Sequence, residues 1–386
     1  MSDSPVIDEI TPDELYRDMR RGNPPYILDV RNEDEFANWV IEGLPADSLL
    51  NIPYFAFLED EHGCLARVPR GRDVAVVCAK GGSSAFVASL LTQHGIRARN
   101  LQGGMIAWGD LHMTMRVPSP PALGLSLFQI NRVGKRCLSY LIVSNGEAQV
   151  IDPARHIDWY MSLAQAQQAQ LTRVIDTHLH ADHLSGGPAL ARALGIPYHI
   201  RLDDAAGAQF PYHSLADGDR LALGSSVVEI ITLHTPGHTP GSTSLLVNER
   251  YLLTGDTLFV SSIGRPDLGD KAEEWAQLLY RTLFDRIVGL PDDVLILPAH
   301  YSAVGEMRQD GIVATTLGEA RQKNPVFQRR TEQQFLEYVL ARLPAQPPIY
   351  QEIRRANLGR IVLDAEHAIE AELGPNQCAA ALSPQV

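Results

Sequence analysis

The chain has 386 residues, of which 45% are hydrophobic and 20% charged, and its mean hydropathy is −0.10. This composition predicts a folded globular protein, and no apolar run approaches the roughly 18 residues that a membrane-spanning helix needs. The formal net charge of −13 disfavours nucleic acid and anionic membranes as partners, which leaves small molecules and allows a homo-oligomer. The length favours two domains, and the absence of a visible secretory signal favours a cytoplasmic location.

The first part of the chain is predicted to alternate helices and strands around a parallel sheet. Thr11 has the character of a helix cap, with Pro12 at the first helical position. Two apolar runs, residues 26–30 and 74–77, are predicted as buried strands, and residues 83–91 have helical periodicity. This alternation indicates an α/β domain.

Cys78 stands directly behind the second predicted strand, where a loop leads into the helix. The loop consists of Ala79, Lys80, Gly81, Gly82, Ser83 and Ser84. Backbone N–H groups of such a loop and the positive end of the helix favour the thiolate, which is the nucleophilic form of cysteine, and Lys80 adds a positive charge. We therefore predict that Cys78 is catalytic; the alternative is an inert buried cysteine.

A proline-rich stretch over residues 116–121 predicts a connector between domains. The expected organisation is a first domain over 1–115, a linker over 116–122, a second domain over 123–345 and a C-terminal extension over 346–386. Strands are predicted in the second domain over 137–143, 148–151, 174–176, 226–233, 243–247, 251–253 and 294–297. Helices are predicted over 188–194, 271–287 and 332–341, and in the extension over 365–373.

Seven potential metal ligands follow predicted strands of the second domain. They are His178, His180, Asp182, His183, His238, Asp256 and His300. Strand ends can bring such residues to one point of a sheet edge, where glycine and proline allow the sharp turns that aim them. Imidazoles and carboxylates together suit first-row divalent metals, so the sequence predicts a metal site.

The remaining cysteines are expected to play no chemical part. Cys137 lies in an apolar strand and is predicted to be a core residue, while Cys64 and Cys378 stand in polar or terminal segments. The scattered positions, without a C-x-x-C pair, speak against both a disulfide framework and a cysteine-based zinc site.

The order of the seven ligands resembles that of the metallo-beta-lactamase superfamily, over about residues 123–301. The resemblance implies an αββα sandwich with the metal site at one edge of its two sheets. Dizinc members such as glyoxalase II use all seven positions, so that one zinc would be held by His178, His180 and His238, the other by Asp182, His183 and His300, and both by Asp256.

Persulfide dioxygenases, a subset of that superfamily, imply a smaller ligand set for one Fe(II): His178, His238 and Asp256. Two imidazoles and one carboxylate leave positions open for a thiol persulfide, O₂ or water. The other four residues would then orient ligands or bind water: His180, Asp182, His183 and His300. The segment around Arg265 looks like the substrate-side loop of this subset, which suggests that Arg265 grips a substrate carboxylate; a structural pair with Asp267 is the alternative.

The first part of the chain resembles rhodanese domains, over about residues 7–110. The matching motifs are Leu28-Asp29-Val30-Arg31, Asn51-Ile52-Pro53, the Cys78 loop and Leu101-Gln102-Gly103-Gly104. Rhodaneses carry sulfane sulfur as a cysteine persulfide, so this role is implied for Cys78. Ser83 stands where an arginine is common, which predicts a weaker anion site and a poor use of thiosulfate compared with a persulfide.

The sequence thus predicts a rhodanese-like α/β domain followed by a metallo-beta-lactamase-like αββα sandwich. The leading functional hypothesis is an Fe(II)-dependent dioxygenase that oxidises a low-molecular-weight thiol persulfide, such as glutathione persulfide, to sulfite and thiol, coupled to sulfur transfer at Cys78. The alternative is a thioester hydrolase with two Zn(II) that resembles glyoxalase II. A third reading is a persulfide sensor or sulfur carrier whose metal is structural.

Overall fold

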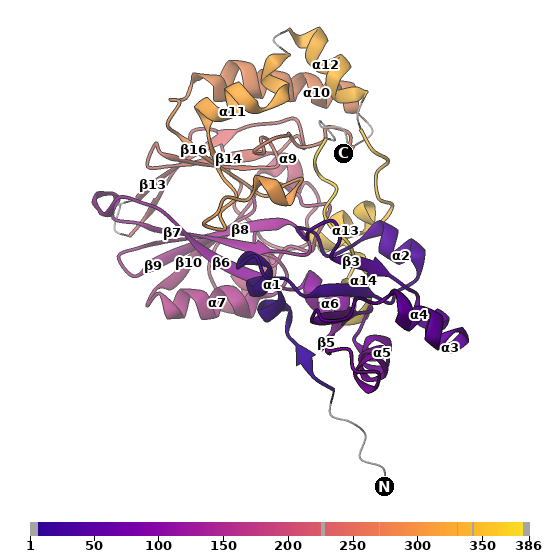
Figure 1. Cartoon of the computed structure of the whole chain (residues 1–386). Coiled ribbons are helices and arrows are strands. Elements are labelled where there is room, and N and C mark those ends of the chain that lie inside the picture. Colours follow the sequence, from indigo (N-terminus) through magenta and orange to yellow (C-terminus); the bar gives the residue numbers. More distant parts are fainter. Residues whose placement is uncertain (1–6, 225–227, 270, 330, 342, 381–386) are drawn as a thin grey trace. The chain divides into compact units, whose positions relative to one another are not determined.

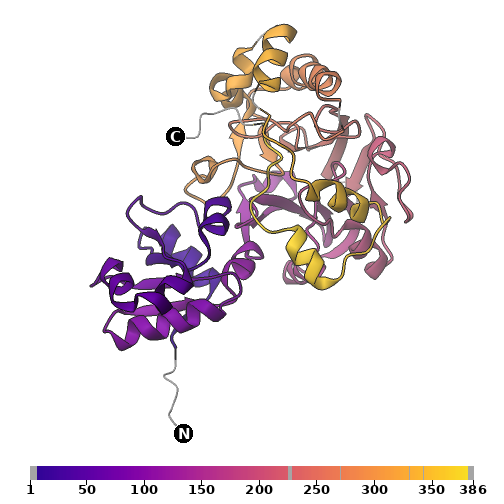
Figure 2. The same cartoon turned by 90° about the vertical axis from the view of Figure 1, so that its right-hand side faces the viewer.

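The computed structural model describes residues 7–224, 228–269, 271–329, 331–341 and 343–380 (Figure 1, Figure 2). Its chain divides into two compact units. The first takes in the residues up to His112 together with Arg132–Lys135 and Leu373–Pro375; the second takes in Met113–Asn131, Arg136–Glu372 and the residues from Asn376 on. The domain boundaries expected above stay a prediction.

The first unit is built on a five-stranded parallel sheet in the order β1-β5-β4-β2-β3. Its strands are β1 (Glu9–Ile10), β2 (Tyr26–Asp29), β3 (Leu49–Asn51), β4 (Val74–Val77) and β5 (Ala98–Leu101). Its helices are α1 (Pro12–Arg20), α2 (Glu33–Asn38), α3 (Tyr54–Glu59), α4 (Glu61–Arg67), α5 (Gly82–Gln93) and α6 (Gly104–Gly109). The predicted parallel α/β domain is confirmed, and Thr11 caps α1 as expected.

The second unit contains two six-stranded sheets, in the orders β11-β10-β9-β8-β7-β6 and β12-β13-β14-β15-β16-β17. The first is formed by β6 (His112–Val117), β7 (Ser126–Arg132), β8 (Cys137–Ser144), β9 (Glu147–Ile151), β10 (Gln170–Ile175) and β11 (Tyr198–His199). The second is formed by β12 (Arg220–Leu223), β13 (Val228–His234), β14 (Thr243–Val247), β15 (Tyr251–Gly255), β16 (Leu295–Pro298) and β17 (Thr315–Thr316).

The described helices of this unit are α7 (Ile157–Ala166), α8 (Gly187–Leu194), α9 (Leu202–Ala205), α10 (Ala272–Arg281), α11 (Leu317–Lys323), α12 (Glu332–Leu340), α13 (Ile349–Asn357) and α14 (Ala365–Ala371). Of these, α7 lies on the outer face of the first sheet, and α10, α11 and α12 lie on the outer face of the second (Figure 1). Apolar side chains of both sheets, such as Tyr140 and Leu253, form one buried cluster between them. Separate clusters lie under α7 and α8 and under α10 to α12. The predicted αββα sandwich is confirmed.

Several predicted elements differ in detail from the structure. Strand β6 includes residues 116–117 of the expected linker, and β7 was not predicted. Of the strand expected over 226–233, residues 226–227 lie outside the described part, and β13 begins at Val228. The helix expected over 271–287 ends at Arg281 and continues as a π-helical turn. No helix among the described residues is both long and apolar enough to cross a membrane.

Candidate metal centre

Ends of strands β10, β13, β15 and β16 deliver the seven predicted ligands, all of which are buried. The structure places them in several groups, some of which share a residue: Asp256 groups with His178 and His238 and also with His300. One group, here called the metal triad, consists of His178, His238 and Asp256, whose ligand atoms all lie within 4.8 Å of one another. These are the three residues that the resemblance to persulfide dioxygenases implies.

Within the metal triad, two imidazoles face one carboxylate. Asp256 Oδ2 lies 3.6 Å from His178 Nε2 and 3.3 Å from His238 Nε2. Both nitrogens and both Asp256 oxygens are buried and have no hydrogen-bond partner among the described residues. Buried polar atoms are rarely left unpaired, because each costs the free energy of its lost hydration. The donor set therefore fits a divalent cation held between these atoms.

Outward hydrogen bonds fix which nitrogen of each imidazole faces the centre. Thr177 Oγ1 donates to Asp152 Oδ2 at 2.9 Å, so it accepts from His178 Nδ1, also at 2.9 Å. His238 Nδ1 donates to the backbone oxygen of Arg265 at 2.8 Å. With Nδ1 protonated in both residues, Nε2 presents a lone pair to a metal.

Burial sets the charge state of the triad. It lowers the pKa of His178 well below its ordinary value and the pKa of His238 to about 3, so both imidazoles are neutral, which is the form that binds metal. Burial also raises the pKa of Asp256 to about 7. A bound cation would favour the ionised carboxylate by direct charge attraction.

Replacing Thr177 by valine is expected to lower metal affinity by about 10- to 100-fold, because the shape is kept while the acceptor for His178 Nδ1 is lost. Metal affinity measured by competition with a chelator checks this. The control is Thr172→Val in the preceding strand β10, whose hydroxyl donates to Ala148 O and not to a triad residue. Equal affinities of the two variants would contradict the positioning role of Thr177.

His180 belongs to a different group, with Asp152 and Asp176. Its Nε2 lies 3.2 Å from Asp152 Oδ1, while its Nδ1 is buried without a hydrogen-bond partner in the described part of the chain. Asp152 thus contacts His180 directly and reaches His178 through Thr177. The three remaining ligand-type residues, Asp182, His183 and His300, lie together in a further group.

Arg265 forms the structural pair with Asp267 that the sequence analysis gave as the alternative to a substrate contact. Its side chain is fully buried and makes two hydrogen bonds to Asp267, Nε to Oδ1 at 2.7 Å and Nη2 to Oδ2 at 2.8 Å. It also donates to the backbone oxygens of Gln377 and Pro344. A guanidinium so enclosed has no face for a substrate carboxylate, so the expected substrate contact of Arg265 is corrected to an internal one.

Close packing beside Arg265 explains why position 264 is occupied by glycine. A Cβ added to Gly264 would lie 1.8 Å from Asp256 O and 3.0 Å from His238 Nδ1. Any side chain at this position would displace the backbone of Asp256 and crowd the ring of His238.

The C-terminal extension holds the loop that carries the histidines, which sequence reasoning missed. Asn357 Nδ2 donates to the backbone oxygens of His180 and His183, each at 2.9 Å. Glu372 Oε1 accepts from Leu184 N at 2.7 Å. Nothing in a local sequence pattern predicts contacts between residues so far apart in the chain.

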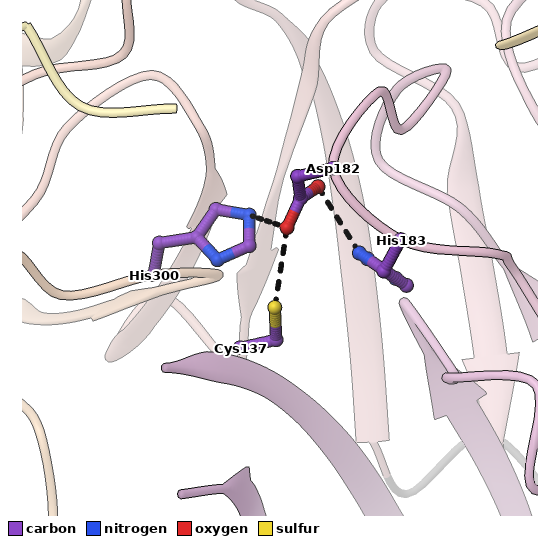
Figure 3. A group of neighbouring side chains, drawn as sticks. All are labelled: Cys137, Asp182, His183 and His300. Carbon is purple, nitrogen blue, oxygen red and sulfur yellow. Dashed lines mark hydrogen bonds and ion pairs between the residues drawn. The ribbon is translucent and has the colours of Figure 1, made fainter. Parts of the chain in front are cut away.

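Two cysteines that were expected to be chemically silent lie beside ligand-type residues. Cys137 Sγ is 3.2 Å from Asp182 Oδ2. Cys378 groups with Asp256 and His300. Cys137 is a buried residue of β8, as predicted, but it also contacts a carboxylate (Figure 3). Cys378 was expected in a tail, whereas the structure buries it completely.

In the first unit, Cys78 is buried at the end of β4, as expected, and its loop surrounds the sulfur. Cys78 Sγ accepts from Gly81 N at 3.1 Å, and Ser84 Oγ lies 3.1 Å from it. Ser84 Oγ is also 2.7 Å from Asn100 Oδ1. Lys80 is exposed. A backbone amide and a hydroxyl at the sulfur suit a thiolate or a persulfide anion.

Gly104, the first residue of α6, packs against the Cys78 loop. It has a φ of +60°, and an added Cβ would lie 2.2 Å from Cys78 O. Only glycine combines that backbone conformation with such a close approach.

The second unit has the fold and the site of a metal-binding αββα protein: two packed sheets, with buried imidazole and carboxylate ligands at the ends of their strands. The first, separate α/β unit carries the Cys78 loop. The description "metallo-beta-lactamase superfamily" matches residues 132–300, and "rhodanese-like domain" matches residues 11–111. The chain belongs to the metallo-beta-lactamase superfamily and carries an N-terminal rhodanese-like domain.

The relatives of the chain in that superfamily include proteins with two different named activities. The chain is 32% identical over 181 residues to mitochondrial persulfide dioxygenase ETHE1 of Bos taurus, covering 46% of this chain and 66% of that protein. It is 31% identical over 196 residues to cytoplasmic hydroxyacylglutathione hydrolase of Arabidopsis thaliana, covering 48% and 71%. The chain spans less than two thirds of the length of the bovine, human and mouse persulfide dioxygenases that it matches.

Two solved structures share the fold of the larger unit. ETHE1 from Myxococcus xanthus aligns with a TM-score of 0.51 and 26% identity, covering 62% of this chain and 97% of that one. A metallo-beta-lactamase from Staphylococcus aureus aligns with a TM-score of 0.57 and 29% identity, covering 62% and 75%.

Proposed function

We propose that the chain is a persulfide dioxygenase, which uses O₂ to oxidise a low-molecular-weight thiol persulfide such as glutathione persulfide to sulfite and free thiol. The observation that carries the proposal is that His178, His238 and Asp256 form one group of ligand atoms, while His180 lies with Asp152 and Asp176 instead. Two imidazoles and one carboxylate are the ligand set of many non-haem Fe(II) oxygenases. Relatives named persulfide dioxygenase support the same conclusion.

One Fe(II) held by the metal triad would supply open coordination positions at which the persulfide sulfur and O₂ can meet. The chain's own residues prepare that site. Thr177 and the backbone oxygen of Arg265 hold the two imidazoles with Nε2 facing inward. The buried surroundings exclude bulk water, which strengthens the attraction of the Asp256 carboxylate for a cation. We propose that His180 acts as a positioning residue through Asp152.

A thioester hydrolase with two Zn(II) is the second candidate, and one observation favours it. The two oxygens of Asp256 face different histidines: Oδ2 faces the triad, and Oδ1 lies 3.3 Å from His300 Nε2. Such a carboxylate can bridge two metals, which together would lower the pKa of a shared water. Relatives named hydroxyacylglutathione hydrolase agree with this candidate.

Metal analysis and two assays on the full chain from its native host distinguish the candidates. About one iron per chain and oxygen uptake that depends on glutathione persulfide are expected from the dioxygenase. About two zincs per chain and cleavage of a glutathione thioester would overturn it in favour of the hydrolase. Persulfidation of Cys78 without either turnover would indicate the sensor or carrier.

We also propose that Cys78 carries sulfane sulfur to or from the dioxygenase reaction as a cysteine persulfide. Attack of the thiolate on the outer sulfur of a donor persulfide forms Cys78–S–S⁻ and releases the donor thiol. The amide of Gly81 and the hydroxyl of Ser84 lie at the sulfur that changes charge.

Replacing Cys78 by serine is expected to abolish sulfur transfer to cyanide, because no other sulfur lies in the loop. Oxygen uptake with supplied glutathione persulfide is expected to remain, since the metal triad lies in the other unit. Cys64→Ser, which changes a second buried cysteine of the same unit, is the control for both assays. Loss of oxygen uptake in the Cys78→Ser protein would contradict this division of labour.

Replacing Ser83 by arginine is expected to improve the use of thiosulfate as sulfur donor relative to glutathione persulfide. A guanidinium at the loop adds a fixed positive charge beside the reacting sulfur, where thiosulfate carries both of its negative charges and the persulfide group of glutathione persulfide carries only one. The ratio of kcat/KM for the two donors measures the effect, and an unchanged ratio would contradict the weak-anion-site explanation.

A further inference from the structure

A buried carboxylate outside the predicted ligand set lies between the two loops that carry the imidazoles of the metal triad. These loops are here called the His178 loop, residues 176–186, and the His238 loop, residues 235–242. The carboxylate is that of Asp204 in the short helix α9, and it is buried, whereas its neighbour Asp203 is exposed. Burying a carboxylate costs free energy unless hydrogen bonds compensate for the lost water. The partners of Asp204 therefore show what it holds.

Both oxygens of Asp204 accept hydrogen bonds from the two loops. Its Oδ2 accepts from Leu179 N in the His178 loop at 2.8 Å and from Thr239 Oγ1 in the His238 loop at 2.6 Å. Its Oδ1 accepts from Gly241 N, also in the His238 loop, at 2.8 Å. One carboxylate therefore ties together two segments that are about 60 residues apart in the chain.

The contacts of Asp204 stand next to the two imidazole ligands of the triad. Leu179 directly follows His178, and Thr239 directly follows His238. The ring centroids of these two histidines lie 4.9 Å apart, and their planes make an angle of 85°. Because both neighbouring residues bind the same oxygen of Asp204, this carboxylate constrains the distance and the angle between the two rings.

The His178 loop is held to its surroundings on both sides of the histidine. On one side Thr177 O accepts from Thr243 N at 2.8 Å, and on the other side Leu179 N donates to Asp204. The approach of the His238 loop to the carboxylate is close, since a Cβ added to Gly241 would lie 2.5 Å from Asp204 Cγ. Loss of the carboxylate would thus release one of the two ties beside the ligand.

We propose that Asp204 is a positioning residue of the metal triad, which sets the relative placement of its two imidazoles through Leu179 and Thr239. The inference rests on the proposed function, because it assigns Asp204 a part in shaping the iron site. Asp204 itself needs no contact with metal or substrate. Three donors converge on its two oxygens, so an amide in its place would turn an NH₂ group toward at least one of them.

Competition between a chelator and the metal-free full chain for Co(II) tests the proposal without an activity assay. The quantity followed is the affinity for the equivalent of Co(II) that His238→Ala loses. Asp204→Asn is expected to lower this affinity by about 10- to 100-fold and to change the ligand-field absorption of the bound cobalt, since the angle between the imidazoles is no longer fixed. Asp203→Ala, which removes a carboxylate of the same helix that pairs with Arg201, is the matched control and is expected to keep both.

A second variant keeps the Asp204 carboxylate in place. Thr239→Val removes one of the three hydrogen bonds to Asp204, and it is expected to lower the affinity less than Asp204→Asn does, because the bonds from Leu179 and Gly241 stay. Since Thr239 acts through Asp204, the double variant is expected to lose less affinity than the product of the two single losses.

A merely structural role of Asp204 would lower the stability of the unit and leave the affinity of the folded chain unchanged. An unchanged affinity and cobalt spectrum in Asp204→Asn would therefore overturn the proposal. So would an unchanged affinity in Thr239→Val, which decides the matter if Asp204→Asn does not fold, and so would losses that simply multiply in the double variant. These outcomes leave the dioxygenase proposal standing, whereas the absence of any Co(II) binding that depends on His238 would overturn both.

Discussion

Replacing His238 by alanine is expected to remove iron from the triad and to abolish oxygen uptake with glutathione persulfide. His238 is completely buried, and its Nε2 lies 3.3 Å from Asp256 Oδ2, the same oxygen from which His178 Nε2 is 3.6 Å away. Loss of an outer partner of a ligand costs about 10- to 100-fold in metal affinity or activity, and loss of the ligand itself is expected to cost more. Iron content per chain and oxygen uptake, measured on the same preparation, check the result.

His180→Ala is the informative comparison, because the two candidate functions give His180 different roles. In the proposed dioxygenase His180 is not a metal ligand and its Nε2 pairs with Asp152, so the variant is expected to keep iron and a reduced oxygen uptake. In the two-zinc hydrolase His180 binds metal directly. A His180→Ala protein that loses metal as completely as His238→Ala would therefore contradict the three-ligand site.

The location of the metal centre could be predicted because it follows from strand ends. Each of the predicted ligand-bearing motifs comes after an apolar run, and parallel or neighbouring strands bring such positions to one edge of a sheet. The further division of the ligands into groups could not be predicted. It depends on side-chain directions, such as that of His180 toward Asp152, and on contacts such as that between Thr177 and His178.

Other parts of the structure could not be predicted, because their polar groups are buried and form hydrogen bonds with residues that are far away in the sequence. Strand β7 was missed since Gln129 and Asn131 interrupt its apolar pattern, although both are buried. Gln129 exchanges hydrogen bonds with the backbone of Val313, far along the chain. Cys378 is similar: its backbone oxygen accepts from Arg265 N, which brings the C-terminal extension to the metal centre. Such pairings satisfy buried polar groups, yet they leave no local signature.

Replacing Asp267 by alanine is expected to destabilise the second unit by about 3–5 kcal/mol, because it leaves the buried charge of Arg265 without its carboxylate. The side chain of Arg265 is 0% exposed and that of Asp267 is 15% exposed, so water offers little compensation. Hydrogen exchange of the amides in β14 and β15 reports the free energy of opening of this unit by itself. The first unit, which has its own core, is expected to exchange as before.

Asp203→Ala is the matched control, because Arg201 and Asp203 form a pair with the same spacing in the chain. There the side chains are 20% and 48% exposed, and loss of such a pair is expected to change stability by no more than about 1 kcal/mol. The Asp267→Ala protein is also expected to regain part of its stability when Fe(II) is added, since Arg265 O orients His238 and metal binds only the folded unit. Equal hydrogen exchange in the two variants would contradict the role assigned to the buried pair of Arg265 and Asp267.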